Sequence, residues 1–167
     1  MRTITAAVLT CSDRCSRGQQ ADTSGLALVK ILREQLSAEV LATNCLPDDQ
    51  DKITEQLKSW ATVSPRPDLI LTTGGTGLSP RDTTPEATAS ILERRHPGLL
   101  ELARLRCFAK TPKTFLSRGE AGTLGRSLII NLPGSPRGAS ECLLAILDIL
   151  PHAIDTLRGE AVEEASG

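Results

Sequence analysis

An alternation of short apolar runs with segments of helical spacing constrains the fold of this chain more than any other feature. The runs TITAAVLT (3–10), DLILTT (68–73) and SLIINLP (127–133) are typical of strands buried inside a parallel sheet. Between the first two lies LALVKILREQL, in which leucine and valine recur with helical spacing. Strands that alternate with helices predict an α/β fold, a three-layer α/β/α sandwich with a mostly parallel sheet.

The same patterns give the expected elements in chain order. Strands are predicted over residues 3–10, 38–47, 68–73 and 127–133. Helices are predicted over residues 26–36, 48–61, 84–95, 97–108 and 138–159. Thr23 or Ser24 is the expected cap of the first helix, and Pro151 is the site of any kink in the last one. We expect one domain over 1–160 and a frayed tail over 161–167.

Composition argues against several classes of protein. The 167 residues carry a formal net charge of −1 and few aromatic side chains, so we expect no nucleic-acid partner. No apolar stretch approaches the roughly 20 residues of a membrane span, so we expect no membrane partner and a cytoplasmic location. The five cysteines are scattered and lack a nearby histidine, and we interpret them as reduced thiols rather than metal ligands.

Four polar loops are predicted at one edge of the sheet. Ligands of open α/β sheets bind beyond the carboxyl ends of the strands. The segments that follow the predicted strands there are the loops over residues 11–24, 46–51, 74–84 and 133–138. We therefore expect these four loops to form the functional site together.

The third loop begins Gly74-Gly75-Thr76-Gly77, directly after a predicted strand. It lacks the lysine of a Walker loop, and Pro80 stands where a dinucleotide fingerprint requires its last glycine. Glycines nevertheless let backbone amides approach an anion, and a following helix adds its positive end. We interpret the loop as an anion-binding element, and the alternative is a plain tight turn.

Carboxylates stand beside this expected anion site. Asp82 follows the glycines, and Asp48 and Asp49 follow the strand predicted over 38–47. Carboxylates repel a polyphosphate unless a divalent cation lies between them, so the pattern predicts Mg²⁺ bound by Asp48 and Asp82. Helix capping is the alternative role for all of these acids. Three arginines in or near the loops are candidate phosphate ligands: Arg81, Arg118 and Arg137.

Several of these stretches occur together in a recognisable order. TCSDR (10–14), LPDD (46–49), LTTGGTGLSPRDTTPEAT (71–88), LSR (116–118) and LIINLPGSP (128–136) closely resemble the molybdopterin adenylyltransferase family of molybdenum-cofactor biosynthesis. That family includes MogA, MoaB and the G domain of gephyrin. The similarity runs from about Ile4 to Gly159, and the block TGGTG-x-x-x-RD-x-TPEAT is its most specific part.

The resemblance implies a molybdopterin-binding α/β fold, a homotrimer, and a reaction in which Mg²⁺ and ATP adenylate the terminal phosphate of molybdopterin and release pyrophosphate. We expect a separate protein to insert molybdate afterwards. The family's functional aspartates correspond to Asp48 and Asp82. Its substrate- and nucleotide-binding positions correspond to Ser12, Asp13, Gly74, Gly75, Thr76, Ser117, Asn131, Pro133, Gly134 and Ser135. Further binding candidates in the same stretches are Gly77, Arg81, Glu86 and Arg118.

Two other functions stay open at this point. One is a molybdopterin-binding or scaffolding protein without catalysis, against which the presence of both Asp48 and Asp82 counts. The other is an unrelated small-metabolite enzyme on a similar sheet, which would require several ordered motif matches to be accidental. An assay for ATP-dependent pyrophosphate release distinguishes the first alternative from an adenylyltransferase.

Overall fold

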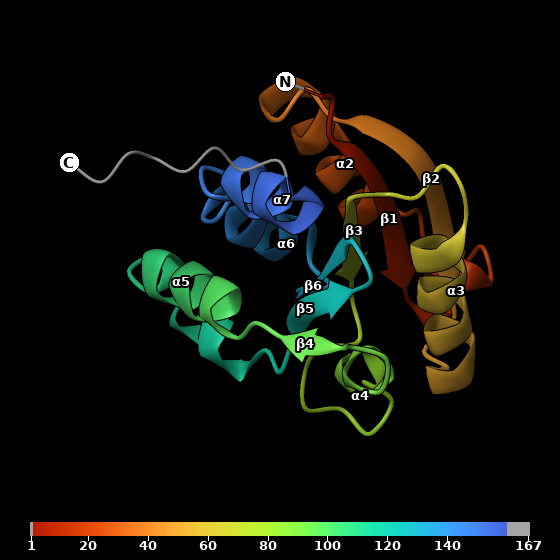
Figure 1. Cartoon of the computed structure of the whole chain (residues 1–167). Helices are drawn as coiled ribbons and strands as arrows, with labels where there is room; N and C mark the ends of the chain where they lie inside the picture. The colour runs from red at the N-terminus through yellow and green to blue at the C-terminus, as the bar shows by residue number, and fades with distance from the viewer. Residues whose placement is uncertain (1, 160–167) are drawn as a thin grey trace.

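The computed structural model describes residues 2–159, which form a mixed sheet with helices on both faces (Figure 1). Its strands are β1 (Thr5–Cys11), β2 (Glu39–Leu46), β3 (Leu69–Thr73), β4 (Arg94–Arg95), β5 (Ala121–Leu124) and β6 (Ser127–Leu132). Its helices are α1 (Asp13–Ser16), α2 (Thr23–Gln35), α3 (Gln50–Thr62), α4 (Thr84–Ala89), α5 (Gly98–Cys107), the 3₁₀ helix η1 (Pro112–Leu116), α6 (Pro136–Leu144) and α7 (Leu150–Arg158). The tail predicted over 161–167 lies outside the described residues, and the single domain over 1–160 stays a prediction.

The strands follow the order β2-β1-β3-β6-β5-β4 across the sheet. Strand β1 pairs in parallel with β2 and β3, and β3 pairs in parallel with β6. Strands β5 and β4 run antiparallel at the other edge. The predicted α/β sandwich with a mostly parallel sheet is therefore confirmed, and the parallel pairs put the carboxyl ends of β1, β2, β3 and β6 at one edge.

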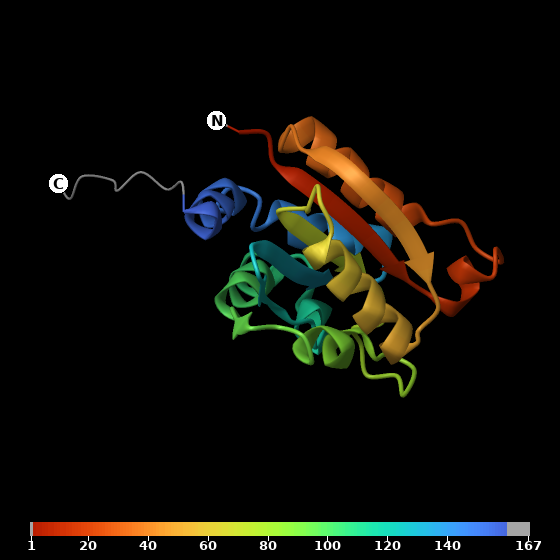
Figure 2. The ribbon, with the colours of Figure 1, turned by 45° about the vertical axis from the view of Figure 1, so that its right-hand side comes forward.

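Alternate residues of the strands face two separate cores, because side chains point to opposite faces of a sheet in turn. On one face, Val8, Leu71 and Ile130 pack with side chains from α2, α5, α6 and α7. On the other face, Leu9 and Ile70 pack with side chains from α3 and α4. Figure 2 shows α2 and α3 on opposite sides of the sheet. Both faces are thus covered, as the continuous apolar runs of the sequence require.

The segment predicted as one helix over 84–95 contains a helix and a strand. Helix α4 ends at Ala89, and the exposed pair Arg94–Arg95 forms β4 beside β5. The amide of Glu93 also donates to the carbonyl of Thr123 at 2.9 Å. Neither short strand has a pattern of its own in the sequence. Pairing across the sheet therefore overrides the helical spacing of this stretch.

The C-terminal segment is divided, so the prediction of one helix over 138–159 is wrong. Helix α6 ends at Leu144, α7 begins at Leu150, and Pro151 lies in the first turn of α7. A proline at that position loses no helical hydrogen bond, because the first amides of a helix have no partner within it. Pro151 therefore starts a helix instead of kinking one.

The loop after β1 also differs from its prediction. Asp22, and neither Thr23 nor Ser24, caps α2, because its Oδ1 accepts a hydrogen bond from the Gly25 amide at 2.8 Å. The loop contains the short helix α1, whose cap is Ser12. Asp22, one position before Thr23, thus accepts the hydrogen bond from the first turn of α2 that was predicted for a serine or threonine hydroxyl.

Two further expectations concern the whole described part of the chain. Between residues 2 and 159, no helix is both long and apolar enough to cross a membrane. None of the five cysteines forms a disulfide, and their interpretation as reduced thiols rather than metal ligands stays a prediction. Cys11, Cys107 and Cys142 are buried.

A buried ion pair joins the last helix to the start of the sheet. The Arg158 guanidinium donates from Nη2 to Asp68 Oδ2 at 2.6 Å and from Nε to Asp68 Oδ1 at 3.0 Å. It also donates to the carbonyl of Thr3 at 3.0 Å. Burial opposes ionisation of Asp68, but Arg158 and Thr5 outweigh it and lower the pKa of that carboxyl.

We predict that Arg158→Gln lowers the free energy of unfolding by about 3–5 kcal/mol at pH 7, because it leaves a buried carboxylate without its partner. A lowered folded pKa adds stability above the unfolded value of about 3.9, and that stability is lost as the pH falls through the folded value. The deficit of the variant should therefore shrink below about pH 4. Urea unfolding at pH 7 and again below about pH 4 measures this loss of stability, with Arg33→Gln at an exposed position as the control. An unchanged midpoint for Arg158→Gln contradicts the anchoring role.

Candidate functional site

The four predicted loops lie together at the carboxyl edge of the sheet. The Ser12 amide donates to the Leu46 carbonyl at 2.9 Å, which joins the loops after β1 and β2. The Gly74 amide donates to the carbonyl of Leu132 at 3.2 Å, and the Thr73 hydroxyl donates to the Pro133 carbonyl at 2.7 Å. The loops after β3 and β6 are therefore held side by side.

Asp13 links three of these loops. Its amide donates to Asp48 Oδ2 at 3.1 Å, and the Asp48 amide donates back to Asp13 Oδ1 at 3.1 Å. The Arg81 guanidinium also donates to both oxygens of Asp13, from Nη2 at 2.8 and 2.9 Å and from Nε to Oδ2 at 3.1 Å. Arg81 is thereby bound to a carboxylate of the protein, and the loops that carry Asp48 and Asp82 are fixed through Asp13.

The second carboxyl oxygen of Asp48 is buried and has no hydrogen-bond partner. Burial raises the pKa of Asp48, and the nearby carboxylates of Asp13 and Asp82 add to the effect. The Thr84 hydroxyl beside it is also buried and unpartnered. A Cβ at Gly75 would contact Thr84 and would lie 3.0 Å from Asp48 Oδ1. The space that Gly75 leaves free therefore contains two polar oxygens that lack partners.

Asp82 stands at the other side of the glycine loop. Its Oδ2 accepts from the Ser79 amide at 3.1 Å, and a Cβ at Gly77 would lie 2.8 Å from the same oxygen. Helix α4 begins after Thr83 and has no side-chain cap, so Asp82 does not cap it. The capping alternative is correct for Asp49 alone, whose Oδ1 accepts from an amide in the first turn of α3 at 3.1 Å.

Arg118 is hydrogen-bonded to the backbone of the glycine loop. Its Nε donates to the Gly77 carbonyl and its Nη2 to the Asp82 carbonyl, both at 2.8 Å. The same guanidinium forms an ion pair with Glu86, which lowers the pKa of that carboxyl. Arg118 and Glu86 therefore support the loop, and a direct contact of either with a ligand stays a prediction.

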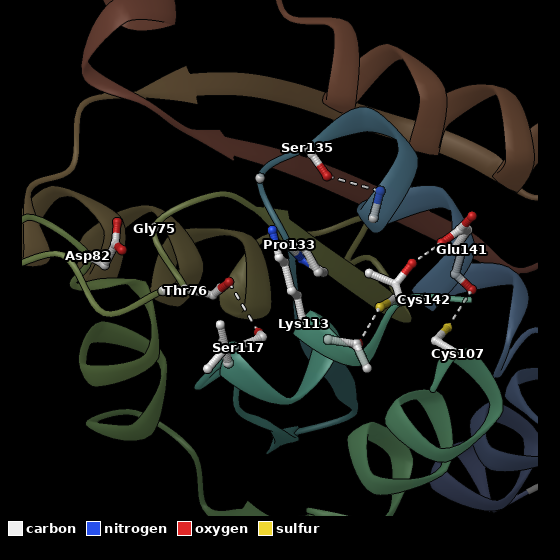
Figure 3. A pocket seen from close by; sticks show the side chains of 16 residues that line it. Gly75, Thr76, Asp82, Cys107, Lys113, Ser117, Pro133, Ser135, Glu141 and Cys142 are labelled. Carbon is white, nitrogen blue, oxygen red and sulfur yellow. Dashed lines mark hydrogen bonds between the residues drawn. The ribbon is translucent and has the colours of Figure 1, made fainter. Parts of the chain in front are cut away.

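A pocket of about 480 Å³ lies at this edge beside the glycine loop (Figure 3). Eight of the predicted site residues line it: Gly75, Thr76, Gly77, Asp82, Ser117, Pro133, Gly134 and Ser135. The Ser117 hydroxyl donates to that of Thr76 at 3.2 Å, and Ser135 caps α6 by accepting from the Gly138 amide at 3.0 Å. Thr76 and Ser117 thus bring hydroxyl groups to the part of the pocket wall beside the glycines.

A smaller hollow of about 220 Å³ lies on the other side of the glycines. It is lined by Ser12, Asp48 and Gly74, and it shares Gly75 and Gly134 with the larger pocket. The backbone of these glycines is the partition, since a Cβ at Gly134 would lie only 3.1 Å from the Cα of Gly74. Asp48 therefore lines the hollow on one side of the partition, and Asp82 lines the pocket on the other.

Five predicted site residues line neither hollow: Asp13, Arg81, Glu86, Arg118 and Asn131. Of these five, only Asn131 is buried. Its side chain is buried in the sheet, where the amide nitrogen donates to the hydroxyls of Thr72 and Thr88 at 2.9 Å each. Its oxygen accepts from the Glu120 amide at 3.0 Å. These bonds use both side-chain N–H groups, so Asn131 ties β3 and α4 to β6.

The sequence reasoning missed the part of the pocket that α5, η1 and α6 provide. Lys113, Cys107, Cys142 and Glu141 all line it. Segment 107–115 does not follow a strand of the parallel sheet. The rule that ligands bind beyond the carboxyl ends of the strands therefore could not identify it. A lysine close to the conspicuous LSR stretch (116–118) was the one signal in the sequence.

Comparisons with known proteins agree on one family. A family profile described as a probable molybdopterin binding domain matches residues 7–152. The chain is 42% identical over 156 residues to the molybdenum cofactor synthesis protein cinnamon of Drosophila melanogaster, covering 92% of this chain and 26% of that protein. It is 38% identical over 164 residues to a molybdopterin adenylyltransferase of Helicobacter pylori strain J99, covering 98% and 93% of the two chains. The fold is similar to the crystal structure of the molybdopterin biosynthesis enzyme MoaB of Thermus thermophilus, with a TM-score of 0.89, 48% identity, and coverage of 95% and 99%.

We predict that Asp48→Asn is more stable than the wild type at pH 7. A raised folded pKa means that stability is greatest below the unfolded value of about 3.9 and falls as the carboxyl ionises. The asparagine oxygen can still accept from the Asp13 amide, and its NH₂ group can donate to Thr84. The gain should disappear below about pH 4. Thermal melts at both pH values test this, with Asp49→Asn as a control that keeps its cap; a destabilised Asp48→Asn contradicts the prediction.

Proposed function

Because this chain belongs to the probable molybdopterin-binding domain family, we propose that it is a molybdopterin adenylyltransferase. It transfers the adenylyl group of ATP to the terminal phosphate of molybdopterin, in molybdenum-cofactor biosynthesis. Relatives that it covers over most of their length carry this name, at 38% identity in Helicobacter pylori and 34% in Escherichia coli. The observation that supports the proposal best is the unpartnered Asp48 oxygen behind Gly75, at the partition between the two hollows.

The residues present fit a bound Mg²⁺. Asp48 offers a buried carboxyl oxygen without a partner, and Gly75 and Gly77 keep the space beside Asp48 and Asp82 free of side chains. Among residues 2–159, no group of three or more acids, histidines and cysteines is arranged to bind a metal. Two carboxylates with substrate phosphate oxygens are the usual ligand set of Mg²⁺. Asp48 and Asp82 would hold the ion, which when bound neutralises phosphate charge and polarises the phosphorus.

The reaction is a direct transfer between two bound substrates. An oxygen of the molybdopterin phosphate attacks the α-phosphorus of ATP, and the bond from that phosphorus to the pyrophosphate oxygen breaks. The thiols beside the site are poor nucleophiles, since burial raises the pKa of Cys11 to about 12 and that of Cys142 to about 11. The proposed transfer therefore uses no covalent enzyme intermediate. The protein contributes by positioning the two substrates.

Several groups of the chain itself would bind and orient the substrates. The backbone at Gly75 and Gly77 lets phosphate oxygens approach closely, and Thr76 and Ser117 add hydroxyl donors. Lys113 brings a positive charge to the middle of the larger pocket (Figure 3). These donors and this charge would hold anionic groups beside the two aspartates. We propose ATP as the donor of the adenylyl group.

A surface of exposed apolar side chains on α5 and η1 supports self-association. Leu105 is 67% exposed, Phe108 55%, Phe115 52% and Leu116 55%. The Phe108 and Phe115 rings pack edge to face, with centroids 5.8 Å apart. We propose that this α5–η1 surface is the contact of the homotrimer that the family resemblance implies. Because Leu116 also lines the pocket, the contact would border the site. A separate molybdate-insertion protein and a cytoplasmic location stay predictions.

We predict that Asp82→Asn lowers adenylyl transfer at least 100-fold, or roughly 3 kcal/mol of barrier, while molybdopterin still binds. The amide keeps an oxygen for the Ser79 amide but loses the charge that a cation requires. Single-turnover pyrophosphate release with saturating molybdopterin, ATP and Mg²⁺ measures the effect, and Asp51→Asn on the outside of α3 is the matched control. Normal turnover by Asp82→Asn means that the mechanism is wrong. Absence of any transfer by the wild type supports the non-catalytic alternative instead.

We predict that the wild type sediments as a trimer at micromolar concentration and that Leu105→Lys with Phe115→Lys sediments as a monomer. Charged side chains cannot be buried in an apolar contact without a large loss of solvation. Leu26→Lys on α2 is the control, because Leu26 is 67% exposed, as Leu105 is, but lies elsewhere. A wild type that is monomeric under these conditions refutes the proposed assembly.

A further inference from the structure

The larger pocket has an acidic side chain at each end. Figure 3 shows Asp82 and Gly75 at one end, Glu141 with Cys107 and Cys142 at the other, and Lys113 between them. The end at Asp82 contains the acids and glycines proposed to act on phosphate. Glu141 lies away from that chemistry, and neither the proposed metal nor the transfer step uses it.

Two contacts hold the Glu141 carboxylate in place at this end. Arg137 Nε donates to Oε1 at 2.9 Å, and the Thr111 hydroxyl donates to Oε2 at 3.4 Å. The Glu141 side chain is 22% exposed. The Arg137 guanidinium also lowers the pKa of this carboxyl, so the group is an anion at neutral pH. Each oxygen accepts one hydrogen bond and has room for another.

The main chain at Glu141 is fixed as well. Its carbonyl accepts from the Cys107 thiol at 3.5 Å, which joins α6 to the end of α5. The neighbouring Cys142 thiol lies 3.8 Å from the Thr114 hydroxyl on η1. The carboxylate therefore projects from a rigid corner between three helical elements. Cys107 and Cys142 lie beside it in the pocket, and their weakly polar side chains suit the faces of a flat ring (Figure 3).

A fixed anion in a pocket for phosphate-bearing substrates needs an explanation, since like charges repel. The carboxylate becomes favourable when it faces neutral N–H donors, because hydrogen bonds to a charged acceptor are the strong ones. The 2-amino-4-oxopyrimidine ring of a pterin offers two adjacent donors, the 2-amino group and N3–H. Adenine offers its 6-amino group beside N1, which is an acceptor and is repelled by a carboxylate.

On the basis of the proposed function, we propose that Glu141 is the residue that selects the pterin ring. Its two carboxyl oxygens accept the 2-amino and N3–H hydrogens, and Thr111 and Arg137 hold them in that orientation. The pterin then lies at the α5–α6 end of the pocket, and the terminal phosphate extends toward Asp82. Adenine is excluded from this end, which leaves the other side of the glycine partition for the nucleotide.

Direct binding titrations of pterin and lumazine test the proposal, because lumazine carries a 2-oxo group in place of the 2-amino group. The wild type should bind pterin at least tenfold more tightly than lumazine. In Glu141→Gln this preference should vanish or reverse, because the glutamine NH₂ donates to the 2-oxo group while its oxygen accepts N3–H. An unchanged pterin preference in Glu141→Gln overturns the proposal.

Three controls keep the outcome specific. Arg137→Gln removes one of the two contacts that hold the carboxylate but leaves its charge, so it should bind both rings less tightly while still favouring pterin. Glu141→Asp keeps the charge, and it should bind both rings less tightly while still favouring pterin. ATP affinity and thermal melts should be unchanged in Glu141→Gln; an equal loss of ATP affinity overturns the assignment of this end to the pterin. Adenylyl transfer by the wild type is measured in a separate assay. Absence of transfer contradicts the proposed function, whereas the binding titrations test the role of Glu141 independently.

Discussion

The close approach of three backbone segments at the carboxyl edge of the sheet is the constraint on which the site depends. Gly74 has φ +100°, and a Cβ there would collide with the Cys11 carbonyl. A Cβ at Gly134 would lie 3.1 Å from the Cα of Gly74. Side chains at either position would separate the loops after β1, β3 and β6. The partition between the two hollows is thus only as thick as a polypeptide backbone, with Asp48 on one side of it and Asp82 on the other.

The stabilising and destabilising contacts of this protein lie at opposite ends of the strands. At the amino ends, the Arg158–Asp68 pair is buried and fully hydrogen-bonded, and it closes the described chain onto its own start. At the carboxyl ends, Asp48 is buried with one oxygen unpaired, beside an unpaired Thr84 hydroxyl. Unsatisfied buried polar groups cost free energy and persist where function requires them. The fold tolerates them because its two cores and the distant ion pair supply the stability.

The buried strands and the glycine loop were predictable from the sequence, because their structure depends on residues that are close together in the chain. The runs around Leu71 and Ile130 are apolar because both faces of their strands are covered, and the glycine loop follows directly from its strand. Asp22 differs by one position from the predicted cap, because several residue types satisfy the same amide. Strands β4 and β5 depend on each other and leave no periodic pattern. Lys113 and Glu141 join the pocket only through tertiary packing, so no spacing rule could locate them.

The two-residue strand β4 has a consequence for how the molecule behaves among its neighbours. A sheet edge is a row of free amides and carbonyls onto which another chain can add. Here the last strand consists of Arg94 and Arg95 alone, both exposed, so the row is short and carries positive charge. A second molecule that approached this edge would meet repulsion from the identical arginines and find little backbone to pair with. Growth of the sheet by addition of further chains is therefore disfavoured at this edge, even at the high local concentrations that follow synthesis.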